Sequence, residues 1–257
     1  MERPLEPAAF LQSVTFDMRR GLSLEAIAAS IRNQGLCILK SVLAPDGALE
    51  IHDRFNGWYE SAKDDNGDGK NDRVLQSALT LPNFPGLADR FIAFLAASRF
   101  PDIGRHYFSC ATGNLVIPEN HVLLRVLSDY THSLLVRRSS RRHNFHLDYP
   151  LIPHSFPMNV WIPLTKIDQD CRGLSFLLPY TESIYDLPLD IDGIMAATNG
   201  YVVTPEADVG DMFLFTHKTL HGVFFTPEKT RPRLSIEFRV GPADMLPADY
   251  RDVLYRL

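Results

Sequence analysis

The sequence contains few cysteines, and their positions form no recognisable pattern. Cys37, Cys110 and Cys171 are odd in number and far apart in the chain. This spacing provides neither a disulfide framework nor the close pairs of a structural zinc site. We therefore expect a protein of a reducing compartment and predict that it is cytoplasmic.

Excess positive charge is also missing. The 26 lysines and arginines are outnumbered by 31 aspartates and glutamates, which gives a net charge of −5 at pH 7. A protein that binds nucleic acid through its general surface charge is basic. We therefore expect no nucleic-acid partner.

Long apolar runs are absent as well. No stretch approaches the roughly 20 apolar residues that a membrane-spanning helix needs. Residues 1–13 hold two acidic residues and two prolines and do not resemble a signal peptide. We expect no membrane partner and make no prediction about the oligomeric state.

The length of 257 residues and the 45% hydrophobic content are sufficient for one domain with a substantial core. Within it we predict a support region of helices and strands over about residues 1–115 and a β core over about residues 116–245.

A set of metal-binding residue types stands out in the second half of the chain. His146 and Asp148 form a His-x-Asp pair, and His221 follows much later in the sequence. Residues two apart on a strand point to the same side, so the pair can hold one ion from one direction. Two imidazoles and one carboxylate are the facial triad that binds mononuclear Fe(II) and leaves the opposite positions open. Alone, the pair is a weak signal, because a polar pair at a strand end has the same appearance.

Two further histidines lie near these candidates. His217 precedes His221 by four residues and is an alternative third ligand, although a loop histidine is the simpler interpretation. His143 lies three residues before His146 and would point to the opposite side of a strand, which favours a supporting or surface position.

Residues 233–240 alternate strictly between polar and apolar side chains, which predicts a strand. The polar face carries Arg233, Ser235, Glu237 and Arg239. A strand that faces water shows the same alternation. Alternatively, Arg233 and Ser235 bind a carboxylate, because a guanidinium forms two parallel hydrogen bonds to it and a hydroxyl adds a neutral donor. Their place on the strand that follows His221 favours this carboxylate clamp.

The ordered set of motifs resembles the phytanoyl-CoA dioxygenase-like branch of the Fe(II)- and 2-oxoglutarate-dependent oxygenases. The motifs are His146-x-Asp148, Gly210-Asp211, His221-Gly222 and Arg233-x-Ser235, with the predicted strands 159–164 and 173–179 between the ligands. The resemblance covers about residues 123–240. The chain departs from the family at Tyr180-Thr181-Glu182, where Gly-Ser-His is frequent, and lacks the usual asparagine after His221. No particular substrate is therefore carried over.

This resemblance implies a mainly β (α+β) fold, a double-stranded β-helix or jelly roll with N-terminal helices packed on its outer sheet. It implies Fe(II), 2-oxoglutarate and O2, with His146, Asp148 and His221 on the metal and Arg233 and Ser235 on the far carboxylate of 2-oxoglutarate. The implied reaction forms succinate and CO2 and hydroxylates an unactivated C–H bond of a metabolite, for instance in natural-product biosynthesis. Desaturation, ring closure or epimerisation would use the same ligands, whereas the presence of Asp148 disfavours halogenation.

Asn159 and Trp161 lie on the same side of the predicted strand 159–164. From there Trp161 would form a wall of the co-substrate pocket, and Asn159 would hydrogen-bond the co-substrate. A tryptophan of the ordinary core is the alternative.

Four arginines precede the His-x-Asp pair, namely Arg137, Arg138, Arg141 and Arg142. Charge runs are usually solvated loops, but loops beside active sites often carry recognition. We predict that these arginines, with Arg125 on the strand 122–127, bind the anionic group of a small-molecule substrate, such as a carboxylate, a phosphate or a carrier-linked thioester.

The segment Asp64–Asp72 resembles a calcium-binding loop, because oxygen ligands alternate around a glycine turn. Leu75 occupies the place of the bidentate acid of an EF-hand, and the motif is not repeated. A solvated acidic loop is the alternative interpretation.

In the first half, residues 22–34 predict a helix capped by Ser23, residues 36–41 a strand, and residues 45–62 and 91–97 two further helices. These elements would pack against the outer sheet.

Two other classes of function remain open. The triad would hold a structural or sensory ion in a barrel without catalytic activity, or Asp64–Asp72 would form a calcium-dependent binding module. Of the three hypotheses, the oxygenase is the one that explains the Arg233-x-Ser235 pair.

Overall fold

The computed structural model describes residues 6–21, 23–62, 79–80, 86–127, 145–146, 148, 158–171, 173–178, 193, 195–196, 200–223, 231–246 and 254–257. The elements in chain order are α1 (Pro7–Val14), β1 (Thr15–Asp17), α2 (Leu24–Gln34), β2 (Leu36–Lys40), α3 (Pro45–Ala62), β3 (Leu79–Thr80), α5 (Leu87–Ala97), α6 (Phe100–Phe108), β4 (Leu115–Pro118), η2 (Glu119–His121), β5 (Leu123–Leu127), β6 (Met158–Pro163), β7 (Ser175–Leu178), β8 (Tyr201–Val203), β9 (Met212–Phe215), β10 (His221–Gly222), β11 (Arg233–Pro242), η3 (Ala243–Met245) and β12 (Leu254–Arg256).

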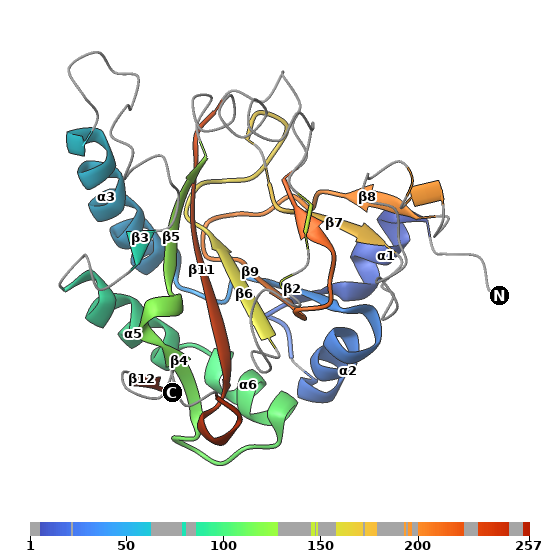
Figure 1. The fold of residues 1–257 in the computed structure, drawn as a ribbon, viewed down its shortest axis with the longest axis horizontal. Helices are drawn as coiled ribbons and strands as arrows, with labels where there is room; N and C mark the ends of the chain where they lie inside the picture. The colour runs from blue at the N-terminus through green and yellow to red at the C-terminus, as the bar shows by residue number, and fades with distance from the viewer. Residues whose placement is uncertain are drawn as a thin grey trace.

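The larger sheet is built around β11, which runs through the middle of the molecule in Figure 1. In the described part of the chain its strand order is β1-β2-β9-β6-β11-β4-β12, and β5 and β3 extend it beside the first half of β11. β11 pairs with β6 over Ser235–Val240 and with β5 over Arg233–Glu237. The strands predicted at 122–127, 159–164 and 233–240 are therefore confirmed within one residue at their starts.

A smaller sheet, β10-β7-β8, packs on one face of the larger sheet. The ring of Phe176 on β7 lies 6.0 Å from the ring of Phe213 and 5.4 Å from that of Phe215, both on β9. Leu36, Ile38 and Trp161 belong to the same buried cluster. An apolar layer thus joins two β sheets, which is the mainly β architecture that the sequence predicts.

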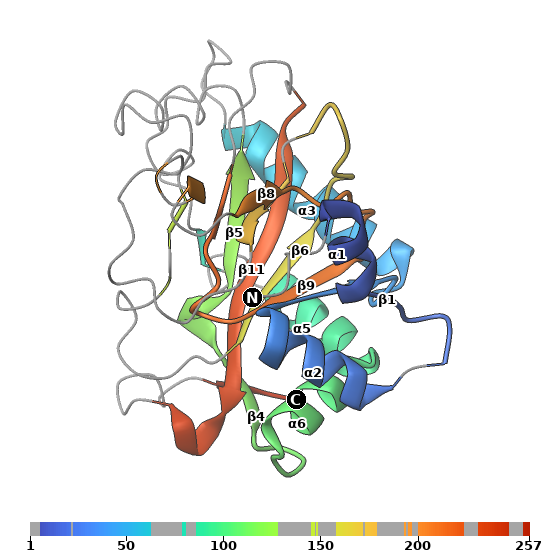
Figure 2. The same ribbon diagram turned by 90° about the vertical axis from the view of Figure 1, so that its right-hand side faces the viewer.

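The other face of the larger sheet is covered by helices, which gather on one side of it in Figure 2. Phe238 of β11 makes edge-on ring contacts with Phe91 of α5 and Phe100 of α6, at 5.6 Å and 5.8 Å. Ile27 and Ile31 of α2 join this cluster. The predicted packing of N-terminal helices on the outer sheet is confirmed. None of the helices found in the described residues is long and apolar enough to cross a membrane.

Local signals account for the helix ends near the N-terminus. The Ser23 hydroxyl accepts a hydrogen bond from the Ala26 N–H at 3.1 Å and begins α2, as predicted. Gly35 ends it in the left-handed conformation, with φ of 70°. α3 has the predicted bounds, whereas α5 begins four residues before the predicted start at residue 91.

The polar face of β11 is buried rather than exposed to water. Arg233, Ser235, Glu237 and Arg239 are at most 9% exposed. Their neighbours across the ladder on β6 are Pro163, Trp161 and Asn159, and cross-strand partners share a face of the sheet. The alternation therefore reflects an interior face that is polar, and the alternative of a water-facing strand is wrong for this chain.

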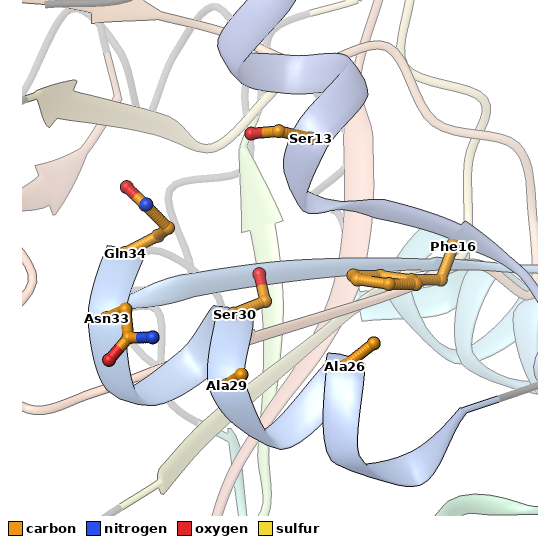
Figure 3. A pocket seen from close by; sticks show the side chains of 7 residues that line it. All are labelled: Ser13, Phe16, Ala26, Ala29, Ser30, Asn33 and Gln34. Carbon is orange, nitrogen blue, oxygen red and sulfur yellow. The ribbon is translucent and has the colours of Figure 1, made fainter.

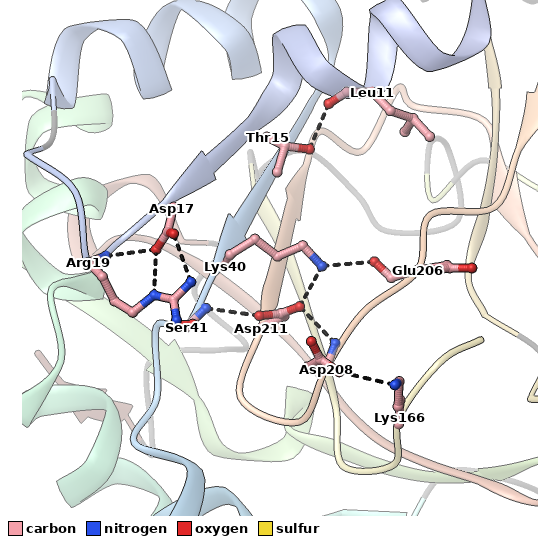
Figure 4. Close-up of polar contacts among 10 residues, drawn as sticks. All are labelled: Leu11, Thr15, Asp17, Arg19, Lys40, Ser41, Lys166, Glu206, Asp208 and Asp211. Carbon is pink, nitrogen blue, oxygen red and sulfur yellow. Dashed lines mark hydrogen bonds and ion pairs between the residues drawn. The ribbon is translucent and has the colours of Figure 1, made fainter.

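A polar turn at Gly210 and Asp211 joins the ends of β2 and β9 (Figure 4). The Asp211 carboxylate accepts from Lys40 Nζ at 2.7 Å and from the Ser41 N–H at 2.9 Å. Gly210 has a φ of 91°, and a Cβ there would lie 2.8 Å from the carbonyl oxygen of Leu43. Backbone conformation and close approach both require glycine at this position.

We expect Gly210→Ala to lower the free energy of unfolding by about 1–3 kcal/mol, because it adds a side chain to a left-handed residue against rigid backbone. Gly57→Ala is the control, since an added Cβ at this helical glycine meets nothing within 4 Å. We expect it to raise the stability by about 0.5–1 kcal/mol. Urea unfolding of both variants measures these changes, and equal midpoints would contradict the assignment of the turn.

Candidate metal centre

His146 and His221 lie directly opposite each other on neighbouring backbone segments. The His146 N–H donates to the His221 carbonyl at 2.9 Å, and the His221 N–H donates back at 3.1 Å. Residues that exchange both bonds in this way point to the same side, and the two rings lie 4.6 Å apart between centroids. Backbone pairing thus brings together two imidazoles that are far apart in the sequence.

Asp148 completes the group. Its Oδ1 lies 3.8 Å from Nε2 of His146, and one donor atom from each of His146, Asp148 and His221 lies within 4.8 Å of the others. Ligand bonds of about 2.0–2.2 Å place two donors at most about 4.4 Å apart on one ion. The 4.8 Å limit exceeds this span by a few tenths of an ångström, and His146, with a side chain that is 44% exposed, is the least enclosed of the three residues. The three residues predicted as ligands therefore converge, and His217, the alternative third ligand, is outside this group.

The imidazole of His221 is held in the form that binds a metal. Its Nδ1 donates to the Thr219 carbonyl at 2.8 Å, which leaves the lone pair of Nε2 free for an ion. Burial, reinforced by the neighbouring His146, lowers the pKa of His221 to about 4. At neutral pH the ring is therefore uncharged, as a metal ligand must be.

The turn that carries His221 is attached to the end of α2. The Gly35 carbonyl accepts from the Thr219 hydroxyl at 2.7 Å and from the Thr216 N–H at 3.2 Å. Thr219 is also the residue whose carbonyl orients the His221 ring. The junction between α2 and β2 thus supports a candidate ligand that lies far from it in sequence.

Asp148 is held at one of its two oxygens. Its Oδ2 accepts from Asn159 Nδ2 at 2.6 Å and from Arg239 Nη2 at 2.9 Å. Its Oδ1 is the oxygen nearest to His146. The carboxylate is therefore oriented with Oδ1 toward the other two ligands. The amide nitrogen of Asn159 binds this aspartate, which differs from the predicted contact with a co-substrate.

Arg233, Ser235 and Trp161 form a second polar group on the same interior face. The guanidinium carbon of Arg233 lies 5.4 Å from the centre of the Trp161 ring. Burial lowers the pKa of Arg233 to about 10, so the side chain stays cationic at neutral pH. Among the residues that the structure describes, the buried Ser235 hydroxyl and the buried Trp161 ring N–H have no hydrogen-bond partner. Unpaired buried donors around a cation are suited to an anionic ligand with several acceptor atoms.

The structure describes one of the five predicted substrate-binding residues. Arg125 is described, and its Nε donates to Glu237 Oε2 at 2.7 Å. The remaining predicted residues, Arg137, Arg138, Arg141 and Arg142, lie outside the described residues, as does the segment Asp64–Asp72.

Two side chains that contribute to the site, Glu237 and Arg239, have no assigned role in the sequence prediction. Both are on the predicted polar face of β11, and Arg239 has the same parity as Arg233. If this face is taken to lie in the interior, both charges need partners, because a buried charge is costly unless it is paired. That reasoning would have assigned a role to Glu237 and Arg239.

A surface hollow of about 380 Å³ lies elsewhere, between α1, β1 and α2 (Figure 3). It is lined by uncharged residues that include Ser13, Phe16 and Asn33. It shares no residue with the metal group or with the group around Arg233.

No protein-family model matches the chain, and no curated protein has a significant match to it. Several solved structures are similar. AviO1 from Streptomyces viridochromogenes Tue57 is 15% identical with a TM-score of 0.61, over 89% of this chain and 99% of that chain. The non-heme α-ketoglutarate-dependent epimerase SnoN from nogalamycin biosynthesis is 14% identical with a TM-score of 0.55, over 86% and 83%. EctD from S. alaskensis, solved with 2-oxoglutarate and 5-hydroxyectoine, is 14% identical with a TM-score of 0.58, over 87% and 77%. At such identities the similarity is one of fold, and the predicted double-stranded β-helix is confirmed.

We expect the protein to bind one Mn(II) per chain and His146→Ala to bind it at least about 100-fold more weakly, a larger loss than that of a supporting residue. The variant keeps both backbone bonds to His221, so its fold should persist. His217→Ala is the control and should bind Mn(II) like the original protein. Titration calorimetry measures both affinities, and a comparable loss in His217→Ala would contradict the assignment of His221.

Proposed function

We propose that this protein is an Fe(II)- and 2-oxoglutarate-dependent oxygenase of the phytanoyl-CoA dioxygenase-like kind. The observation that carries the proposal is the placement of His146, Asp148 and His221 within reach of one ion, in a sheet whose interior face also holds the buried Arg233. A site for a structural ion alone would not need the buried guanidinium of Arg233. Nor would it need the two buried donors that have no partner among the described residues, the Ser235 hydroxyl and the Trp161 ring N–H.

The residues present fit the two groups that this function requires. His146, Oδ1 of Asp148 and the neutral His221 would hold Fe(II), and this donor set is the facial triad of non-heme iron oxygenases. Arg233 and Ser235 would bind the far carboxylate of 2-oxoglutarate. Trp161 would form a wall of that pocket, and its ring N–H, which has no acceptor in the described part of the chain, would donate to the ligand.

Bound Fe(II) and 2-oxoglutarate would supply the oxidising chemistry, with O2 consumed and succinate and CO2 released. The chain's contribution is to orient the ligands and to keep water away from the carboxylate clamp. Arg233 and Ser235 are at most 4% exposed, so their hydrogen bonds to a carboxylate would form in a medium of low dielectric constant and gain strength from it.

Hydroxylation of a C–H bond is the reaction we propose. The structurally similar proteins include an α-ketoglutarate-dependent epimerase and a protein solved with 2-oxoglutarate and 5-hydroxyectoine, so the fold is compatible with more than one reaction outcome. The carboxylate of Asp148 occupies the position that a halide would need, which favours hydroxylation over halogenation.

We further propose a small anionic or carrier-linked metabolite as the substrate. Arg137, Arg138, Arg141 and Arg142 lie a few residues before the candidate metal ligand His146 in sequence, and arginine forks recognise carboxylates and phosphates. Arg125, whose side chain is 30% exposed, would add a cation on the neighbouring strand.

The assay for this function is anaerobic reconstitution with Fe(II), followed by 2-oxoglutarate and O2 and measurement of succinate. Even without the true substrate, we expect slow succinate formation that requires all three additions. Its loss in His146→Ala would link it to the metal group. An iron-loaded protein that leaves 2-oxoglutarate unchanged would contradict the proposed function.

The carboxylate clamp gives a separate prediction. Arg233→Leu should weaken 2-oxoglutarate binding to the Mn(II)-loaded protein at least about 30-fold, because it removes a buried charge-assisted partner. Ser235→Ala should weaken it about 5- to 10-fold, the value of one hydrogen bond. The unliganded protein should lose no stability in Ser235→Ala, since no described residue hydrogen-bonds the hydroxyl.

The matched control is Arg231→Gln, which removes an arginine that pairs with Asp168 at the surface. It should leave 2-oxoglutarate binding unchanged. Calorimetric titration with 2-oxoglutarate gives the affinities, and thermal unfolding gives the stability. A destabilised Ser235→Ala with unchanged affinity would assign the serine to the core instead.

A further inference from the structure

Four charged side chains form a continuous chain that ends at the metal group. Arg125 Nε donates to Glu237 Oε2 at 2.7 Å, Arg239 Nη1 donates to Glu237 Oε1, and Arg239 Nη2 donates to Asp148 Oδ2 at 2.9 Å. Positive and negative charges alternate along it. The chain links β5, through β11, to one oxygen of a candidate metal ligand.

This arrangement is buried for most of its length. The side chains of Glu237, Arg239 and Asp148 are 11%, 6% and 7% exposed, and that of Arg125 is 30% exposed. Burial alone would raise the pKa of Glu237, but Arg125 and Arg239 outweigh it and hold the pKa well below the usual range. Burial likewise opposes the charge of Arg239, and Glu237 and Asp148 outweigh it and raise its pKa. Glu237 and Arg239 therefore keep their charges at neutral pH, and each has partners of the opposite sign in this chain.

We propose that Arg239 is a positioning residue that restricts Asp148 to a single coordinating oxygen. The inference rests on the proposed function, because it concerns how that metal group is used. Two donors, Arg239 Nη2 and Asn159 Nδ2, converge on Oδ2, and a carboxylate oxygen has two lone pairs with which to accept hydrogen bonds. Oδ1 is the oxygen left for an ion.

Restriction to one oxygen matters because of the number of positions on the metal. An octahedral ion has six positions, of which a facial triad occupies three. A keto acid that chelates through two atoms leaves one position open. If Asp148 coordinated through both oxygens, it would take that last position, and the proposed reaction would have no place for O2. Arg239 thus preserves an open position rather than adding a ligand.

Glu237 fixes the orientation of Arg239. The guanidinium of Arg239 uses one nitrogen for Glu237 and another for Asp148, and a planar fork held at one end presents its other end in a fixed direction. Arg125 holds the second oxygen of Glu237. These ion pairs also explain why the charged side chains of Glu237, Arg239 and Asp148 can be buried.

The test compares Arg239→Gln with the original protein in two ways. Bound Co(II) reports the number of coordinating atoms through the intensity of its visible absorption, without turnover. We expect the Co(II) spectrum of Arg239→Gln to shift toward a higher coordination number, with Mn(II) affinity within about threefold of the original. With Fe(II), we expect succinate formation to fall about 10- to 100-fold, the range for residues that support metal ligands.

Other outcomes would overturn the proposal. An unchanged Co(II) spectrum, or an Mn(II) affinity that falls in proportion to turnover, would mean that Arg239 only stabilises the site. Unimpaired succinate formation in Arg239→Gln would also overturn the proposal. Arg90→Gln is the matched control, because it breaks a surface ion pair with Glu50 at 2.9 Å and should change none of the three measurements.

Two further variants keep the proposal testable if Arg239→Gln does not fold. Arg239→Lys retains the charge and should restore the original Co(II) spectrum in part. Asn159→Leu removes the other donor to Oδ2 and should shift the spectrum in the same direction as Arg239→Gln. The spectra also separate this inference from the proposed function: an original protein that forms no succinate contradicts the function, whereas the Co(II) comparison still decides the role of Arg239.

Discussion

The burial of charge on the inner face of β11 is the constraint on which the site depends. A charged side chain inside an apolar sheet costs several kcal/mol of stability unless it has a partner. Here Glu237 lies between Arg125 and Arg239, and Arg239 in turn reaches Asp148. The aspartate is thus a candidate metal ligand and at the same time a counter-charge that the fold requires.

The same strand connects this interior face to the helices. Phe238 lies between Glu237 and Arg239 in sequence and points to the other side of the sheet, where Phe91 and Phe100 contact its ring. Packing of α5 and α6 therefore fixes the position of the strand on which Arg239 stands. A site built from side chains of a rigid central strand holds its geometry better than one built on loops.

Features with local causes were predictable from the sequence, and features that depend on distant partners were not. The Ser23 cap, the bounds of α3 and the alternation of β11 follow from neighbouring residues. α1 and α6 are short helices of eight and nine residues, and the sequence analysis predicts neither, because periodicity judged over windows of about 11–18 residues does not resolve elements this short.

The candidate site follows the same rule. His146 and Asp148 are two residues apart, so strand parity alone places them on one side. The backbone pairing of His146 with His221 joins two distant parts of the sequence, and the bond from Arg239 to Asp148 spans 91 residues. No local pattern encodes such a register. The burial of the polar face was also undecided, because alternation is identical whether water or a second sheet covers it.

The pairing of β2 with β9 has a consequence for how the chain folds. Leu36–Leu39 pair with Met212–Phe215. An early strand of the larger sheet therefore pairs with a strand that is synthesised much later. Until then an apolar edge made of Leu36, Cys37, Ile38 and Leu39 stays without its neighbour. Topologies with such remote contacts fold slowly and expose aggregation-prone edges on the way. Closure of the long loop between β2 and β9 is therefore a slow step in the formation of the larger sheet.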